Sequence, residues 1–140
     1  MIADFIKDGK VKLEFHHFPL QMHGAPATTA ANAAECAADQ NSFWPYHDQL
    51  FAQISAQGAS AVTIENMSAL ADSFHLDDAT FTTCVTQQTH SQEVQDSVNQ
   101  AIAQGFPGTP TILVNGQMLD SLDYDTLRNA VNAALAQASN

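Results

Sequence analysis

The feature that most constrains the fold is an Asn-Gly pair, Asn115-Gly116, set between two short apolar segments. Those segments are residues 111–114, Thr-Ile-Leu-Val, and residues 117–119, Gln-Met-Leu. Asn-Gly is the strongest short-range signal for a two-residue type I′ turn, because both central residues must adopt positive φ. The sequence therefore predicts a β-hairpin in its last third.

Helices are predicted through the middle of the chain, from apolar side chains at helical spacing and from capping residues. They are expected over residues 27–39, over residues 43–54, over residues 67–74 after Thr63, from Asp77 or Asp78 through Val85, and from Val94 to Gly105. The aromatic stripe of the second helix, Trp44, Tyr46 and Phe51, is expected to lie in the core, where such stripes are most often found.

Further elements are predicted at both ends of this helical block. A short helix over residues 2–8 is followed by residues 11–15, whose alternating apolar and polar side chains are typical of a half-buried strand. After the hairpin, Asp123 is expected to cap a final helix. With no internal repeat and no shift of composition along the chain, the sequence predicts one α/β domain over residues 1–140.

The charge balance excludes several classes of protein. Fifteen acidic and four basic side chains give a net charge of −11. Such a surface lacks the basic stripe that nucleic acid requires, and no apolar run reaches the roughly 18 residues of a membrane span. The first ten residues contain Asp4 and Asp8 and show no signal peptide. We therefore expect neither a nucleic-acid partner nor membrane insertion.

Several motifs occur in an order that points to one family. They are Phe18-Pro19-Leu20, Ala34-Glu35-Cys36-Ala37, the segment Phe-Trp-Pro-Tyr-His-Asp-Gln-Leu-Phe over residues 43–51, Gly108-Thr109-Pro110-Thr111, and Val114-Asn115-Gly116. In this order the chain resembles the DsbA-like thiol–disulfide oxidoreductases over nearly its whole length. The resemblance implies an α/β, thioredoxin-like fold with a helical insertion over about residues 26–105.

The resemblance assigns a substrate-binding role to Thr109 and Pro110. It implies that their peptide bond is cis and that the exposed backbone pairs with an extended or unfolded polypeptide, although only about 5–6% of X–Pro bonds are cis in general. Related isomerases and kappa-type glutathione transferases carry valine before this proline, so Thr109 favours the disulfide branch. The family also implies a periplasmic or other extracytoplasmic location.

One family feature is missing from the sequence. The Cys-X-X-Cys whose thiolate the start of a helix would activate is absent, and Cys36-Ala37-Ala38-Asp39 does not replace it. No catalytic residue is therefore assigned. The family's first strand and this motif would precede residue 1, so the resemblance implies an N-terminally truncated sheet. We expect residues 11–15 and 111–114 to pair directly, or a second copy or a strand-donating partner to lie between them.

The two cysteines, Cys36 and Cys84, have three interpretations. They are a structural disulfide between two insertion helices, two buried free thiols, or a second redox pair. Members of the resembled family that carry an extra pair in the insertion favour the disulfide. The six histidines show no metal-ligand spacing, so no metal and no cofactor are predicted.

These observations support two hypotheses for the function, and each describes the chain as a module. The first hypothesis is a DsbA-like thiol–disulfide oxidoreductase module that is inactive alone, because the dithiol cycle needs the missing Cys-X-X-Cys. The alternative is a noncatalytic, chaperone-like module that binds extended peptides through the loop at Pro110.

Overall fold

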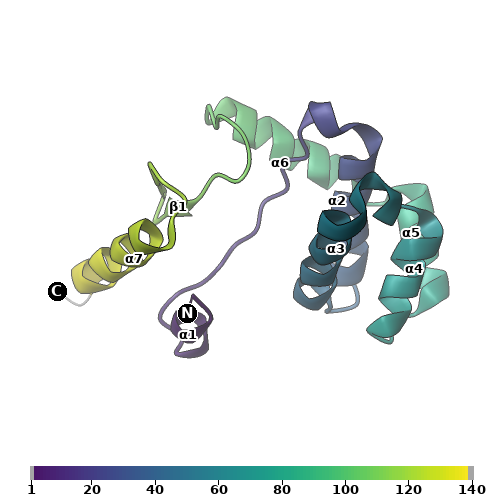
Figure 1. Cartoon of the computed structure of the whole chain (residues 1–140), viewed down its shortest axis with the longest axis horizontal. Helices are drawn as coiled ribbons and strands as arrows, with labels where there is room; N and C mark the ends of the chain where they lie inside the picture. Colours follow the sequence, from purple (N-terminus) through teal and green to yellow (C-terminus); the bar gives the residue numbers. More distant parts are fainter. Residues whose placement is uncertain (1, 139–140) are drawn as a thin grey trace. The chain divides into compact units, whose positions relative to one another are not determined.

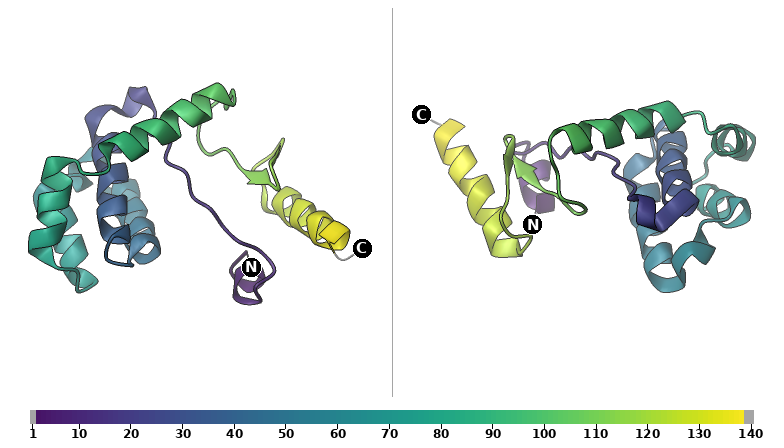
Figure 2. Two further views of the ribbon diagram at one scale, coloured as in Figure 1. Left: turned by 180° about the vertical axis from the view of Figure 1, so that it is seen from behind. Right: turned by 90° about the horizontal axis from the view of Figure 1, so that it is seen from above.

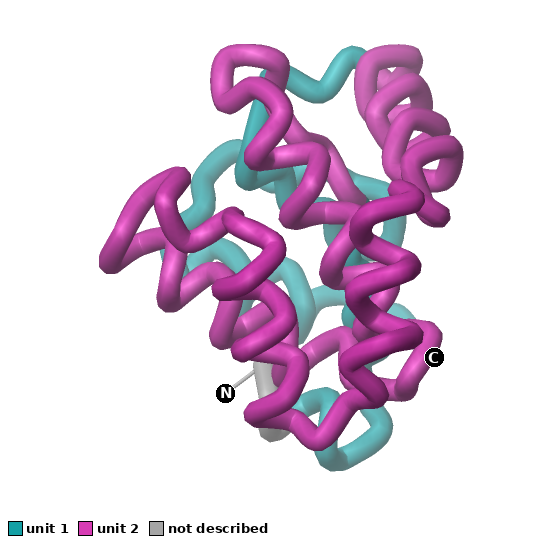
Figure 3. Tube along the Cα trace, turned by 90° about the vertical axis from the view of Figure 1, so that its right-hand side faces the viewer, with its two compact units in different colours: residues 1–16, 105–140 teal, residues 17–104 magenta. Residues whose placement is uncertain are grey.

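The computed structural model of the chain describes residues 2–138, which fall into two compact units (Figures 1 and 3). Residues 17–104 form a helical unit, and residues 1–16 together with 105–140 form a smaller unit that contains the hairpin. The sequence places the helical insertion at about residues 26–105, and the helical unit spans residues 17–104. Along residues 2–138, no helix is long and apolar enough to cross a membrane.

The helical unit contains the five α-helices that the sequence predicts. Its elements are η1 (Gln21–His23), α2 (Gly24–Ala38), α3 (Phe43–Gln57), η2 (Gly58–Ala61), α4 (Ile64–Ser73), α5 (Asp78–Gln87) and α6 (Ser91–Ala103). The alanine-rich α2 contacts α3, α5 and α6 and is the central helix of the unit (Figure 2). Its small side chains allow its neighbours to approach closely, which explains why alanine dominates its sequence.

Side-chain caps define where two of these helices begin. The Thr63 hydroxyl accepts a hydrogen bond from the Asn66 N–H at 3.2 Å at the start of α4. At the start of α5 the Asp77 carboxylate accepts from the Thr80 N–H at 2.8 Å. Hydrogen bonds from the side chain and from the backbone N–H of Thr80 lower the pKa of the Asp77 carboxyl. Of the two acidic candidates in the sequence, Asp77 is therefore the cap.

The core of the helical unit contains only part of the predicted aromatic stripe. Tyr46 is fully buried against Phe81, with ring centroids 5.3 Å apart, whereas Trp44 and Phe51 are 41% and 55% exposed. The prediction is thus wrong for Trp44 and Phe51. At 100° per residue, positions 44 and 51 lie on one face of α3, and position 46 lies on the opposite face with Leu50.

The buried Tyr46 predicts a fall in stability at alkaline pH. Its hydroxyl donates to the Met67 carbonyl at 3.3 Å, and burial raises the pKa of Tyr46 above its ordinary value of 10. The unfolded chain loses this proton above about pH 10 while the folded chain retains it, so the free energy of unfolding should fall by up to about 1.4 kcal/mol per pH unit from this residue.

Urea unfolding between pH 9 and 11, roughly one unit on either side of the ordinary tyrosine value, measures this effect. Tyr46→Phe should flatten the alkaline fall, whereas Tyr124→Phe, a matched change at an exposed tyrosine, should keep the profile of the unsubstituted chain. Identical profiles for both variants would contradict the prediction.

The smaller unit contains the predicted hairpin. Its elements are α1 (Ile2–Lys7), β1 (Leu113–Val114), β2 (Gln117–Met118) and α7 (Tyr124–Ala138). β1 and β2 are antiparallel, with Leu113 opposite Met118, and Asn115 and Gly116 have φ values of 47° and 79°. Both values are positive, as a type I′ turn requires. The hairpin prediction is therefore confirmed.

The predicted strand over residues 11–15 is not formed. In the described part of the chain the sheet consists of β1 and β2, and residues 11–15 lie in neither a helix nor a strand. The direct pairing of residues 11–15 with residues 111–114 was therefore the wrong expectation. Alternating apolar and polar side chains suit a segment to a half-buried sheet. A strand also needs a backbone partner for its hydrogen bonds. A partner supplied by another chain stays a prediction.

Candidate functional site

The first candidate site is the loop that enters β1. The Thr109-Pro110 peptide bond is cis, and both residues are exposed. The Thr111 hydroxyl donates to the Gly108 carbonyl at 2.6 Å and closes the loop across the proline. The expected cis bond is thus present, in a loop whose Thr109 and Pro110 are exposed.

The hairpin holds this loop in place. The Leu119 N–H donates to the Ile112 carbonyl at 2.9 Å and extends the pairing one step towards the proline. α7 packs against β1, and the Asp123 carboxylate caps α7 by accepting from the Thr126 N–H at 2.9 Å. Regular structure therefore supports the loop from its C-terminal side.

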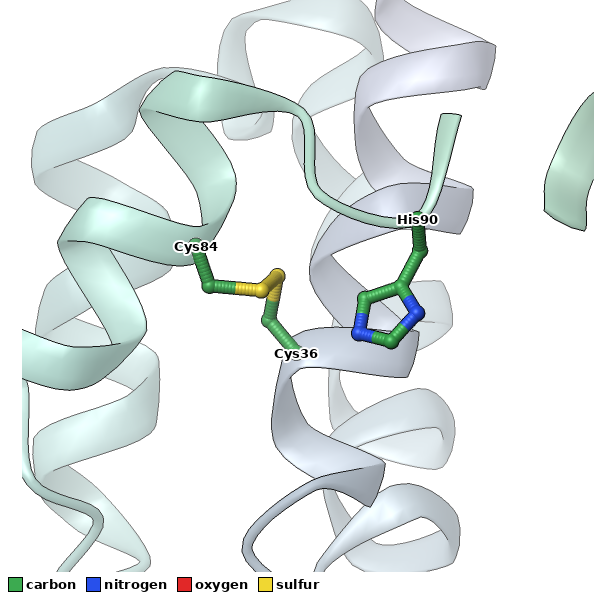
Figure 4. Close-up of side chains that lie close together, drawn as sticks. All are labelled: Cys36, Cys84 and His90. Carbon is green, nitrogen blue, oxygen red and sulfur yellow. A yellow bond between two sulfur atoms is a disulfide. The ribbon is translucent and has the colours of Figure 1, made fainter. Parts of the chain in front are cut away.

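The second candidate site is the disulfide between Cys36 on α2 and Cys84 on α5. Their Cα atoms are 5.8 Å apart, and the structure contains the bond that the resemblance favours (Figure 4). Cys36 is 1% exposed and lies in the last turn of α2. Cys84 is partly exposed and lines a shallow depression with Ala79, Thr80, Thr83 and Thr89.

Asn32 connects the disulfide to the start of α6. It precedes Cys36 by one helical turn, and its side-chain amide lies 3.8 Å from the Cys36 sulfur. Its side-chain oxygen accepts a hydrogen bond from the His90 N–H at 2.9 Å. Asn32 is only 1% exposed, and a buried amide needs such partners. The segment that carries His90 is therefore fastened beside the two sulfurs.

The His90 imidazole lies between two carboxylates. Its Nε2 is 2.8 Å from Asp39 Oδ2 and its Nδ1 is 3.0 Å from Glu93 Oε2. Burial lowers the pKa of His90, but the hydrogen bonds to Asp39 and Glu93 outweigh it, and the net shift is upward. Asp39 Oδ2 also lies 4.0 Å from the Cys84 sulfur. One carboxylate thus faces both the imidazole and the disulfide.

Sequence reasoning did not find His90, Asn32 or Asp39 as a group. His90 and Asn32 are 58 positions apart, and neither belongs to a motif with recognised spacing. The one signal that pointed to this place was the pair of cysteines. The other residues become recognisable only when α2, α5 and α6 pack together.

A buried histidine contact joins the beginning of the helical unit to two of its helices. His17 Nε2 lies 2.6 Å from Glu35 Oε1 on α2, and the His17 carbonyl accepts from the Ser97 hydroxyl on α6 at 2.6 Å. His17 is 7% exposed. It therefore serves to position the segment that leads into α2.

Comparisons with known proteins identify the family of the chain. Residues 1–133 match the family model described as Thioredoxin. The chain belongs to the thioredoxin family. The predicted DsbA-like, thioredoxin-like α/β class is thereby confirmed. No solved structure matches the chain.

Relatives of this thioredoxin-family chain include proteins named for disulfide bond formation. Disulfide bond formation protein D of Bacillus subtilis is 28% identical over 136 residues, which is 94% of this chain and 60% of that protein. Probable disulfide bond formation protein D of Bacillus anthracis is 26% identical over 138 residues, 94% of this chain and 61% of that protein.

A relative with a different name matches at similar strength. Na(+)/H(+) antiporter NhaA 1 of Salinispora arenicola is 30% identical over 137 residues, which is 97% of this chain and 20% of that protein. The chain therefore spans about three-fifths of the length of the two Bacillus relatives and about a fifth of the antiporter.

Proposed function

We propose that this chain is the polypeptide-binding part of a thiol–disulfide oxidoreductase of the disulfide-bond-formation type. The observation that carries the proposal is the exposed loop at Thr109 and Pro110, which leads into β1. Two relatives with disulfide bond formation in their names support the assignment of chemistry. Thr109 and Pro110 are the proposed substrate-binding residues.

The loop suits an extended peptide for a physical reason. Thr109 and Pro110, shortly before β1, are exposed, and an extended chain laid beside them would gain hydrogen bonds of the kind that join strands. Recognition through backbone depends little on the substrate's side chains. The proposed partner is therefore an unfolded polypeptide rather than one folded protein.

The dithiol chemistry of the proposed enzyme needs a redox centre outside this sequence. Both cysteines of the chain are joined in the Cys36–Cys84 disulfide of the helical unit, while the proposed peptide loop belongs to the other unit. Exchange with a substrate disulfide requires an attacking thiolate and a resolving thiol. We propose that residues 1–140 alone bind peptide and do not catalyse exchange.

A peptide-binding measurement with a matched control tests the loop. Fluorescence polarisation of a labelled, reduced and unfolded peptide should show binding that Pro110→Ala weakens at least about tenfold, a change of roughly 1.4 kcal/mol. Pro107→Ala alters an exposed proline three residues earlier and should bind like the unsubstituted chain. Equal losses in the two variants, or no loss in either, would refute the proposed role of Pro110.

An insulin-reduction assay separates the oxidoreductase module from other redox functions. With a dithiol as the electron source, the chain should not raise the rate above that of the dithiol alone. Robust reduction abolished by Cys36→Ser would overturn the proposal and make Cys36 and Cys84 the redox centre. Peptide binding that persists when both cysteines are replaced would favour the noncatalytic, chaperone-like alternative if no redox partner restores activity.

We also propose an extracytoplasmic compartment for the chain. Structural disulfides persist mainly in oxidising compartments, and the Cys36–Cys84 bond ties two helices of the helical unit. Alkylation of acid-quenched native cells measures the thiol state directly. Both cysteines should be protected from the reagent until a reductant is added, and free thiols in most of the protein would refute this location.

A further inference from the structure

The surroundings of the disulfide contain the donor set of a metal site. Across the residues the structure describes, histidine, cysteine and acidic side chains meet at ligating distance in one group of three, Cys36, Cys84 and His90, whose ligand atoms all lie within 4.8 Å of one another (Figure 4). We propose that reduction of the disulfide converts this group into a Zn²⁺ site. The inference does not depend on the proposed peptide-binding function.

The donor types favour zinc among the common divalent ions. Two thiolates and one imidazole are the ligands of many zinc sites, and calcium and magnesium prefer oxygen. Zn–S bonds are about 2.3 Å and Zn–N bonds about 2.0–2.1 Å, so the two sulfurs of a tetrahedral site lie roughly 3.8 Å apart. The Cα atoms of Cys36 and Cys84 are 5.8 Å apart, so side-chain rotation can provide that separation without moving either helix.

Asp39 is positioned to complete the tetrahedron. Its Oδ2 lies 2.8 Å from His90 Nε2 and 4.0 Å from the Cys84 sulfur, so it shares the space into which these two ligands point. Asp39 follows Cys36 by three residues at the end of α2, and both come from the same turn. A carboxylate oxygen is an accepted fourth ligand for zinc.

The groups behind the ligands also fit a metal site. With His90 Nε2 on the metal, Nδ1–H would donate to Glu93, which already lies 3.0 Å away. A carboxylate behind a metal-bound histidine orients the ring and fixes its tautomer. The Asn32 amide, 3.8 Å from the Cys36 sulfur, is placed to donate to a thiolate there. The site thus has candidates for both its ligands and their supports.

The conversion is balanced in electrons and protons. A reductant of the dithiol class exchanges with the Cys36–Cys84 disulfide and becomes a disulfide itself, which leaves two cysteine thiols. Zn²⁺ then forms two Zn–S bonds and displaces one proton from each thiol. Exchange with an oxidant of the disulfide class, which takes up two electrons and two protons and becomes a dithiol, would re-form the Cys36–Cys84 bond, remove both sulfur ligands and release the metal. Metal binding would therefore report the redox state of this pair.

Cobalt titration of the full chain tests the proposal. The chain is reduced with a water-soluble phosphine, which gives two electrons to the disulfide and becomes the phosphine oxide with oxygen from water. The reduced chain is then desalted without oxygen. The reduced chain should bind one equivalent of Co²⁺ with the visible absorption of a tetrahedral site and a sulfur-to-metal band, and Zn²⁺ should displace it. The oxidised chain should show neither band.

Three substitutions assign the ligands. His90→Gln and Cys84→Ser should each weaken Co²⁺ binding by more than about tenfold, which is the low end of the roughly 10–100-fold that a supporting residue contributes. Asp39→Asn should alter the spectrum. His23→Gln, the same change at an exposed histidine outside the cluster, should bind like the unsubstituted chain. A reduced chain that binds no cobalt, shows a six-coordinate spectrum, or binds equally well as His90→Gln overturns the proposal.

If reduction lowers the helix content of the chain, circular dichroism provides a second test of the zinc site. Because metal binding and folding are linked, Zn²⁺ should restore lost helical signal in the reduced chain and should not do so in His90→Gln. Helical signal that zinc leaves unrestored counts against the site. Restoration in both chains would show binding to the cysteines alone and would also count against it.

Discussion

Replacing Cys36 and Cys84 together by alanine should lower the free energy of unfolding by about 2–4 kcal/mol. The bond joins positions 48 residues apart, and a loop of that length restricts the unfolded chain by about 4 kcal/mol in the chain-entropy description. Because whole domains are stable by only about 5–15 kcal/mol, this change would remove a large part of the stability. Urea unfolding monitored by circular dichroism measures it.

Reduction of the unsubstituted chain is the matched control for this prediction. A metal-free reduced chain should lose a similar amount of stability, because it also lacks the loop constraint. Added zinc should recover part of the loss in the reduced chain and none in the alanine variant, whose sulfurs are gone. A loss below about 1 kcal/mol in both would show that packing of α2 against α5, rather than the bond, holds these helices together.

Phe81→Ala should lower the free energy of unfolding by about 3–5 kcal/mol, the usual cost of truncating a buried aromatic ring. Phe81 is 1% exposed on α5 and packs against Tyr46 on α3. Removal of its ring leaves a cavity between α3 and α5, and α5 is the helix that carries Cys84. Chemical denaturation is the measurement, with Cys36 and Cys84 kept oxidised.

Phe51→Ala provides the control for this truncation. Phe51 is 55% exposed on the other face of α3, with its ring 4.6 Å from that of His47. The same loss of a ring there should cost less than about 1 kcal/mol, since surface substitutions are usually small in effect. Comparable losses at the two positions would mean that the buried face of α3 has been assigned wrongly.

The sequence predicted the elements whose signals are local. The Asn115-Gly116 turn, the cap at Asp123 and the helices of the middle region depend on contacts within a few residues, and each is present. The strand over residues 11–15 was predicted with the same kind of local evidence and is absent. Its alternation describes side chains only, whereas a strand also depends on a backbone partner elsewhere in the fold.

The cis-proline loop and the disulfide pair were found through resemblance to a family. Neither the cis bond at Pro110 nor the pairing of Cys36 with Cys84 follows from composition or spacing, because most X–Pro bonds are trans and two cysteines are equally compatible with free thiols. The order of motifs around them supplied the missing information. The structure contains both features.

By itself, then, the sequence determined the hairpin, the helices, the caps at Thr63 and Asp123, and the family. Only the tertiary structure decided which face of α3 is buried and which side chains surround the disulfide. The physical reason is the range of the interactions: caps and turns act within one helical turn, whereas Asn32 meets His90 across 58 positions. Such a contact exists only after apolar packing has brought α2, α5 and α6 together.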